Sequence, residues 1–201
     1  MAKLWDKGFE INAEIEKYTV GRDRELDLYL AQDDVLGSMA HITMLESIGL
    51  LEKDELAALL AKLKEIYGQA LQGDFEIEDG IEDVHSQVEL MLTRSLGEMG
   101  KKIHSGRSRN DQVLVDLRLF TRRQLRLVVE DVCSLFRELQ AQSERYKNVL
   151  MPGYTHLQRA QPITFGHHLM AYAMMLLRDI DRLADCRRRM NQSPIGCCAL
   201  A

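Results

Sequence analysis

The sequence has little proline, and all of it lies late in the chain. Pro152, Pro162 and Pro194 fall in the last quarter of the 201 residues. Proline interrupts helices, so its absence from residues 1–151 leaves long stretches free to be helical. Strand-like alternation of apolar and polar residues is also nearly absent. The sequence therefore predicts an all-α fold.

Cysteine is scarce as well, and its spacing is that of neither a disulfide framework nor a metal site. Two of the four cysteines, Cys197 and Cys198, are neighbours that do not easily bridge each other, and no CxxC pattern occurs. This usage predicts a reducing compartment, the cytoplasm. No apolar run approaches the roughly 20 residues of a membrane helix, and the N-terminus lacks the apolar segment of a signal peptide. We expect no membrane association.

An excess of positive charge is also missing. The chain has 26 Lys and Arg residues against 31 Asp and Glu, a net charge of −5. Nucleic-acid-binding proteins are usually basic, so we expect no nucleic-acid partner. Locally, however, eight Lys and Arg residues between Lys101 and Arg126 face only two Asp residues. Such a stretch suits a small molecule with carboxylates or phosphates, although the arginines from Arg118 onward equally fit a solvated helix face.

Apolar residues recur at helical spacing over most of the chain. Shorter patterns cover about residues 25–48, 54–71 and 81–96. Two longer ones run from after Asn110 to about Tyr146, and from Pro162, which suits a first helical residue, to Met190. Helices this long need several partners to cover their apolar stripes, so we expect a helical bundle. We predict an N-terminal helical domain at 1–108 and an incomplete central long-helix bundle domain at 109–201.

A polar cluster, Ser105-Gly-Arg-Ser-Arg-Asn-Asp111, precedes the first long pattern. Gly106 allows close approach of a ligand to the backbone, and a serine or Asn110 can cap the helix that follows. The free N–H groups of a helix start favour an anion, and the guanidinium groups of Arg107 and Arg109 match carboxylates. Capping alone needs only one of these residues. We therefore favour ligand binding over a purely structural cap.

A second cluster, Gly153-Tyr-Thr-His-Leu-Gln-Arg-Ala-Gln-Pro162, lies in a loop between the two long patterns. A lone histidine is more often structural than catalytic, but His156 shares this loop with several polar side chains and can exchange protons near neutral pH. Elsewhere, His85 and Glu89 have the one-turn spacing of metal ligands. No third ligand is near them in the sequence, so we expect no metal site.

Together these motifs resemble the signature regions of the argininosuccinate lyases, which belong to the fumarase/aspartase superfamily. Further resemblances lie at Leu4-Trp5, Asp34-Val-Leu-Gly-Ser38, Glu82-Asp-Val-His85 and Pro194-Ile-Gly196. The resemblance implies a reversible elimination that splits argininosuccinate into arginine and fumarate, a step of arginine biosynthesis. It implies neither a metal nor an organic cofactor.

The resemblance also implies roles for residues of both clusters. His156, with Thr155 beside it, takes part in proton transfer, either directly or by activating the group that does. Thr155 and Gln158 orient the succinyl end of the substrate. The residues that bind the substrate carboxylates or line their pocket are Ser108, Arg109, Asn110 and His85.

The sequence departs from this family in two places. The family's mobile Gly-Ser-Ser-x-Met-x-x-Lys-x-Asn-Pro loop, which supplies a catalytic serine and a lysine, is not among these 201 residues. The stretch Val20-Gly-Arg-Asp-Arg-Glu25 lacks a serine that family members carry there.

The resemblance further implies a homotetramer whose subunits each contribute five long helices and in which each site draws on three subunits. This chain holds about two of these helices. We therefore expect an N-terminal part of the enzyme that is inactive alone. Two alternatives remain open: a non-catalytic structural protein of the delta-crystallin type, and another superfamily lyase, such as adenylosuccinate lyase.

Overall fold

The structure is a computed structural model that describes residues 13–200, so the Leu4-Trp5 resemblance lies outside the described residues. The chain divides into two compact units. Of the described residues, 13–120 and 193–200 form the first unit, and 121–192 form the second. The domain boundary between residues 108 and 109 stays a prediction.

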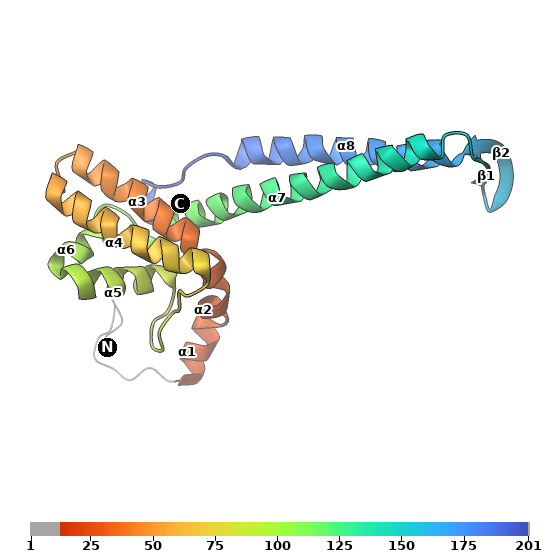
Figure 1. Ribbon diagram of the computed structural model, residues 1–201. Coiled ribbons are helices and arrows are strands. Elements are labelled where there is room, and N and C mark those ends of the chain that lie inside the picture. The colour runs from red at the N-terminus through yellow and green to blue at the C-terminus, as the bar shows by residue number, and fades with distance from the viewer. Residues whose placement is uncertain (1–12, 201) are drawn as a thin grey trace. The chain divides into compact units, whose positions relative to one another are not determined.

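The first unit is helical throughout (Figure 1). Its core is made by three helices, α3, α4 and α5, with shorter helical turns around them. Its elements are α1 (Ala13–Val20), α2 (Asp23–Leu26), the 3-10 helix η1 (Asp27–Tyr29), α3 (Ala31–Ser47), α4 (Lys53–Gln72), α5 (Val84–Leu96), α6 (Glu98–Lys101), η2 (Lys102–His104) and, near the C-terminus, η3 (Cys198–Leu200).

The core of this unit follows from helical spacing of large aliphatic residues. Leu59, Leu63 and Ile66 recur four and three residues apart along α4 and are fully buried. They pack in one cluster with Ile42 of α3 and Leu92 of α5, among others. The burial of these aliphatic faces stabilises the arrangement of α3, α4 and α5, on which the polar groups described below depend.

The second unit contains most of α7 (Arg109–Arg145), the strands β1 (Leu150–Thr155) and β2 (Gln158–Thr164), and α8 (Phe165–Met190). The strands form an antiparallel hairpin whose register shifts after Gly153. The last turns of α7 meet the start of α8: Gly166 donates its N–H to the Tyr146 carbonyl at 3.1 Å, and Ser143 Oγ donates to the Gly166 carbonyl at 2.7 Å.

The all-α prediction is confirmed, and the hairpin is the small exception to it. The predicted helices at 54–71, at 81–96 and from Asn110 to Tyr146 correspond to α4, α5 and α7. The segment 25–48 is not one helix but α2, η1 and α3 in succession.

The prediction that α8 begins at Pro162 is wrong, because Pro162 lies in β2 opposite Pro152. Facing each other, the two prolines confine their missing N–H groups to one position of the ladder. Thr164 is the actual N-cap of α8, with its Oγ1 accepting from the His167 N–H at 3.1 Å.

The long helices expose apolar side chains, as their sequence patterns suggested. Leu117, Val128 and Leu135 of α7 are 43%, 45% and 51% exposed, and Tyr172 of α8 is 49% exposed. The buried residues of α7 are polar instead: Asp111, Gln112, Asp116 and Ser143. Among the described residues, no helix is long and apolar enough to cross a membrane.

Candidate functional site

The start of α7 is built by a reciprocal pair of caps. Ser108, the residue before the helix, donates its N–H to Asp111 Oδ1 at 2.9 Å, and its own Oγ accepts from the Asn110 N–H at 3.3 Å. The Asp111 contact is that of a capping box, whereas the Ser108 hydroxyl caps the second helical residue instead of the third. Gly106 just upstream has a φ of +70°, a conformation that glycine adopts without strain. The predicted cluster therefore does cap the helix, and Asn110 remains exposed beside it.

Asp111 also holds the C-terminal segment of the first unit. Its Oδ2 accepts from the backbone N–H groups of Gly196 and Cys198, both at 3.0 Å. Burial raises the pKa of Asp111, but these donors, together with the Ser108 N–H, outweigh burial and hold the pKa below its usual value. Two of the segments that carried the family resemblance, Ser105–Asp111 and Pro194–Gly196, thus meet at one carboxylate.

The two arginines of the cluster differ in their surroundings. Arg107 is buried and donates to Ser38 Oγ at 3.0 Å, so it belongs to the interior rather than to the surface of the site. Arg109 is partly exposed and lies against the start of α5: its Nε is 2.9 Å from Asp83 Oδ2, and its Nη2 donates to Ser86 Oγ at 3.1 Å. The Arg109 guanidinium group is therefore held in place by the start of α5.

His85 lies in a buried polar group that sequence reasoning missed. Its Nδ1 is hydrogen-bonded to Asp34 Oδ1 of α3 and lies 3.7 Å from Asp116 Oδ2 of α7. Gln112 Nε2 of α7 donates to the same Asp34 oxygen. Asp34 and His85 lie in two of the segments that carried the family resemblance, whereas no sequence signal singled out Asp116. Nothing in the sequence indicated that the two carboxyl groups meet at His85.

Asp34, His85 and Asp116 bear on the metal question as well, because one ligand atom of each lies within 4.8 Å of the others. From the sequence, Glu89 was the candidate second metal ligand beside His85, and no third ligand was near them. A metal at this place would have to displace the proton that His85 Nδ1 shares with Asp34. It would also bring another positive charge to carboxyl groups that already feel the charge of Arg107. The contacts fit a hydrogen-bonded ionic group better than a metal centre.

The second cluster forms the turn of the β1–β2 hairpin. Thr155 and Gln158 are the last paired residues, and His156 and Leu157 connect them with φ values of +49° and +62°. A two-residue hairpin turn in which both φ values are positive favours Asn and Gly. The backbone of His156 and Leu157 is therefore strained in this turn. Thr155, His156 and Gln158 are all exposed. Strain at an exposed polar turn is typical of a functional position rather than a structural one.

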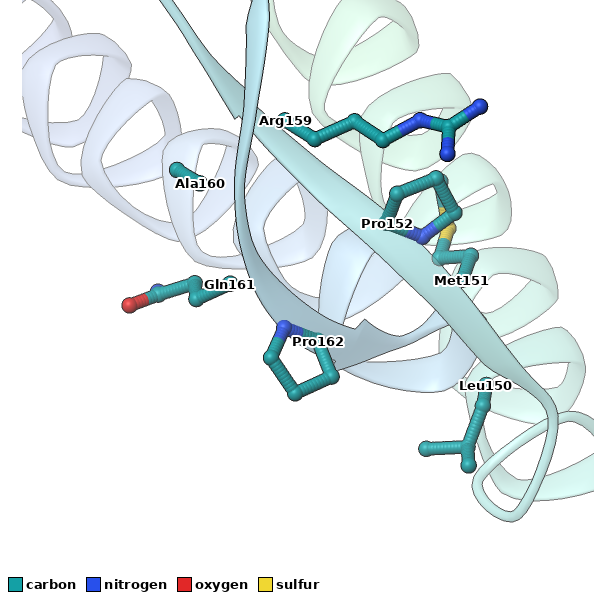
Figure 2. A pocket seen from close by; sticks show the side chains of 7 residues that line it. All are labelled: Leu150, Met151, Pro152, Arg159, Ala160, Gln161 and Pro162. Atoms are coloured by element: carbon teal, nitrogen blue, oxygen red, sulfur yellow. The ribbon is translucent and has the colours of Figure 1, made fainter.

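Two pockets lie against this hairpin. Figure 2 shows one of them: Arg159 lies on the same side of the hairpin as Pro152 and Met151, while Gln161 extends away from them. The other, of about 470 Å³, lies between the hairpin and the first turns of α8. Thr155 lines it together with His167 and His168, which the sequence had not connected with this cluster.

The predicted site residues are thus divided between the two units. Ser108, Arg109 and His85 gather in the first unit, where Arg109 contacts Ser86, the residue after His85. Asn110 is exposed next to them. The residues Thr155, His156 and Gln158 share one turn of the second unit. Their roles toward a substrate stay predictions.

Comparison with known proteins gives concordant results. A protein-family model described as a lyase matches residues 12–201. The chain is 66% identical over 197 residues to an argininosuccinate lyase of Bacteroides fragilis, and 47% identical over 205 residues to one of Methylococcus capsulatus. These alignments cover 98% and 99% of this chain but 44% and 43% of the relatives, so the chain spans less than half the length of either.

Solved structures agree on the fold. An EDDS lyase variant with bound fumarate is similar with a TM-score of 0.72 and 28% identity, over 96% of this chain and 38% of that one. A fumarate lyase:delta crystallin from Brucella melitensis is similar with a TM-score of 0.74 over 94% of this chain and 47% of that one. At 19% identity, this second likeness concerns the fold alone.

Proposed function

The chain belongs to the lyase family of the fumarase/aspartase superfamily, and on that premise we propose that it is the N-terminal part of an argininosuccinate lyase. The observation that carries the proposal is identity of 62–66% to curated argininosuccinate lyases over 98% of this chain, which includes both polar clusters. The proposed reaction is the reversible elimination of argininosuccinate to arginine and fumarate, in arginine biosynthesis.

The first step in this proposal is transfer of a weakly acidic proton from the carbon next to a succinyl carboxylate to a base, which is His156 or a group that His156 activates. The resulting carbanion spreads its negative charge onto that carboxylate, so donors fixed beforehand around the carboxylate stabilise the transition state. The start of α7 supplies such donors: the exposed Asn110 side chain and an Arg109 side chain held by α5. Ser108 shapes this turn through its cap.

In the second step the electron pair of the carbanion forms the C=C bond of fumarate, and the C–N bond breaks with its electron pair leaving on the guanidinium nitrogen of arginine. We assign the proton transfer of the first step to His156, acting directly or through the group that it activates, with Thr155 and Gln158 orienting the succinyl end. Their exposure on one tight turn supports the assignment, because a substrate can reach all three. No step needs a metal or an organic cofactor.

The proposal extends to where and how the protein acts. We propose a cytoplasmic enzyme, because all four cysteines are free. We also propose a homotetramer at full length, because α7 and α8 leave large apolar side chains exposed that further helices would cover. We expect no lyase activity from the 201-residue chain alone, since it does not contain the family's serine and lysine loop.

A chimera tests the activity directly. Residues 1–201 are joined to the part of the Bacteroides fragilis argininosuccinate lyase that follows the matched segment, and fumarate release is followed by its ultraviolet absorbance. We expect release from argininosuccinate and none from adenylosuccinate. His156→Gln is expected to lower kcat by about 10²- to 10⁴-fold, the usual contribution of general acid–base catalysis.

Each outcome of this experiment separates the alternatives. A chimera that releases fumarate only from adenylosuccinate would identify a different superfamily lyase. A folded chimera that acts on neither substrate would favour the structural, delta-crystallin-like interpretation. Lyase activity of the 201-residue chain by itself would contradict the requirement for the serine and lysine loop.

A further inference from the structure

Three helices of the first unit bring an ionisable side chain to one buried point. Asp34 of α3 and Asp116 of α7 are fully buried, and His85 of α5 is 8% exposed. Asp34 Oδ1 is hydrogen-bonded to His85 Nδ1 and to Gln112 Nε2, while Asp116 Oδ2 lies 3.7 Å from His85 Nδ1. Neither Asp34 nor Asp116 has a role in the two steps of the proposed reaction.

The hydrogen bonds fix where the protons are. A carboxylate only accepts, so the Asp34 contact places a proton on Nδ1 of His85 and leaves Nε2 for another partner. Burial by itself would lower the pKa of His85, but the charge of Asp34 and its hydrogen bond outweigh burial and raise it. Burial would likewise raise the pKa of Asp34, and His85, Arg107 and Gln112 reverse this and lower it.

Asp116 is in the opposite state. Burial and the nearby charge of Asp34 raise its pKa to about 10, so it is a neutral acid at neutral pH. A hydrogen bond between the Asp116 and Asp34 carboxyl groups adds to this rise in pKa, because the proton held by Asp116 is donated to the ionised Asp34. Asp116 is closed off from solvent because α3 packs closely against it at Gly37. A Cβ added to Gly37 would lie only 3.5 Å from Asp116 Oδ1 and 3.4 Å from Val115 Cγ1.

Other charged groups surround His85, and together they set its pKa. Asp27 from η1 and Asp83 at the start of α5 favour its protonated form. Arg107 is a cation of the same region. Burial lowers the pKa of His104, and the charges of Arg107 and His85 lower it further. With Asp34 ionised and Asp116 neutral, the charge of Asp34 is the one in direct contact with the imidazolium.

We propose that Asp34, packed against the neutral acid Asp116, is a positioning residue that holds His85 as an imidazolium, with its Nε2–H offered to an anionic group of the substrate. That this anion belongs to a substrate rests on the proposed function. His85 is then a binding residue and not a base, because an imidazolium has no free lone pair to accept a proton. Arg109, whose Nη2 bonds Ser86, is the second cation at this end of α5.

The protonation state is measured on the 201-residue chain by ¹⁵N NMR of the histidine side chains, with His85 assigned by loss of its signals in His85→Gln. We expect His85 to carry protons on both nitrogens at neutral pH. His41 is the internal comparison: it is also buried, its Nε2 is 2.8 Å from the Ser105 carbonyl, and burial lowers its pKa. A neutral His85 at neutral pH in the unmodified chain overturns the proposal.

Asp34→Asn tests the role of the ionised partner. It keeps the shape of the side chain and removes its charge, so we expect the titration midpoint of His85 to fall by about one pH unit or more, as loss of a contacting opposite charge does. The midpoint of His41 should not move. An unchanged His85 midpoint in a folded Asp34→Asn variant would exclude Asp34 as the cause. If the variant does not fold, the titration of the unmodified chain still decides.

Asp116→Asn tests the neutral partner through stability. A folded state that holds a proton on Asp116, which the unfolded state releases above its ordinary pKa, loses stability as pH rises. The unmodified chain should therefore unfold at a lower urea concentration at about pH 8 than at about pH 5, with a steeper decline than Asp116→Asn. His85 should titrate almost unchanged in this variant. Equal slopes would show that Asp116 is ionised in the fold.

The chimera separates this inference from the proposed function. If it is active, Asp34→Asn should raise KM for argininosuccinate about tenfold or more with a smaller change in kcat, as loss of a binding interaction does. A large fall in kcat at unchanged KM would overturn the binding role. A chimera without activity counts against the proposed function, while the NMR result judges the state of His85 independently.

Discussion

Gly166 brings the start of α8 onto the last turns of α7. A Cβ at this position would lie 2.4 Å from the Ser143 carbonyl oxygen and 2.8 Å from Lys147 Cα. Both neighbours are backbone atoms, which no side-chain rotation can move away. The N–H of Gly166 also bonds the Tyr146 carbonyl, so the junction beneath the hairpin depends on this close approach.

Gly166→Ala should therefore destabilise the second unit, by about 1–3 kcal/mol, the usual cost of forced overpacking. Gly68→Ala is the matched control: Gly68 lies inside α4, and no atom lies within 4 Å of the place that an alanine methyl group would take, so alanine should stabilise by about 0.5–1 kcal/mol. Urea unfolding followed by circular dichroism measures both. Equal stability of the two variants would contradict the close approach.

The hairpin turn gives a second prediction at the same scale. Leu157 has a φ of +62° and is fully exposed, so Leu157→Gly should stabilise the turn by up to about 1 kcal/mol without loss of the imidazole. His156→Asn should also relieve strain, but it removes the proposed proton-transfer group. In the chimera, therefore, only His156→Asn should lose activity. Equal loss in both variants would mean that the turn conformation, not the imidazole, matters.

At the scale of elements, Asp83 connects the starts of two helices. Its Oδ1 caps α5 by accepting from the Ser86 N–H at 2.8 Å, and its Oδ2 lies 2.9 Å from Arg109 Nε of α7. The two oxygens thus serve different helices. This connection holds Arg109 beside the turn that carries His85.

Substitutions at Asp83 should separate the two contributions. Asp83→Asn keeps an acceptor for the cap and loses the ion pair, a cost of about 0–1 kcal/mol for a partly exposed pair. Asp83→Ala loses both, and the cap adds about 1 kcal/mol. Glu82→Gln is the control, and we expect a smaller effect from it because Glu82 Oε2 lies farther from the guanidinium group, 3.4 Å from Arg109 Nη1. The free energies of unfolding from urea titrations decide; equal costs for Asn and Ala would exclude the cap.

Elements also show how far local pattern predicts structure. α4, α5 and α7 were predictable because their apolar residues repeat at helical spacing. The β1–β2 hairpin was not, because its strands are short, contain Pro152 and Pro162, and turn at His156 and Leu157 rather than at Asn-Gly. The hairpin is set by pairing between strands and by the junction of α7 with α8, which no local pattern encodes.

At the scale of the whole molecule, the exposed apolar faces of α7 and α8 have a solution consequence. Val128 and Leu135 on α7 and Tyr172 on α8 are about half exposed. Large apolar side chains exposed along a long helix favour association. We expect the 201-residue chain to self-associate, with a light-scattering mass above that of one chain and dependent on concentration.

Substitution of the α7 face tests the cause. The double variant Val128→Gln, Leu135→Gln should lower the mass toward that of one chain. Leu50→Gln should not, since Leu50 is 58% exposed but lies in the first unit outside both long helices. A monomeric unmodified chain, or an equal response to Leu50→Gln, would contradict association through these helices.

The sequence by itself determined the helical class, the long helices with their uncovered stripes, and the two polar clusters at Ser105–Asp111 and Gly153–Pro162, because spacing and residue type along one segment are local properties. Tertiary structure alone decided that Asp34 meets His85 across 51 residues of chain and that Arg107 is interior while Arg109 is held by α5. It also decided that burial and the nearby Asp34 raise the pKa of Asp116. These contacts and pKa values depend on the charges near a group and on its burial. Only the packing of segments distant in the sequence sets the nearby charges and the burial.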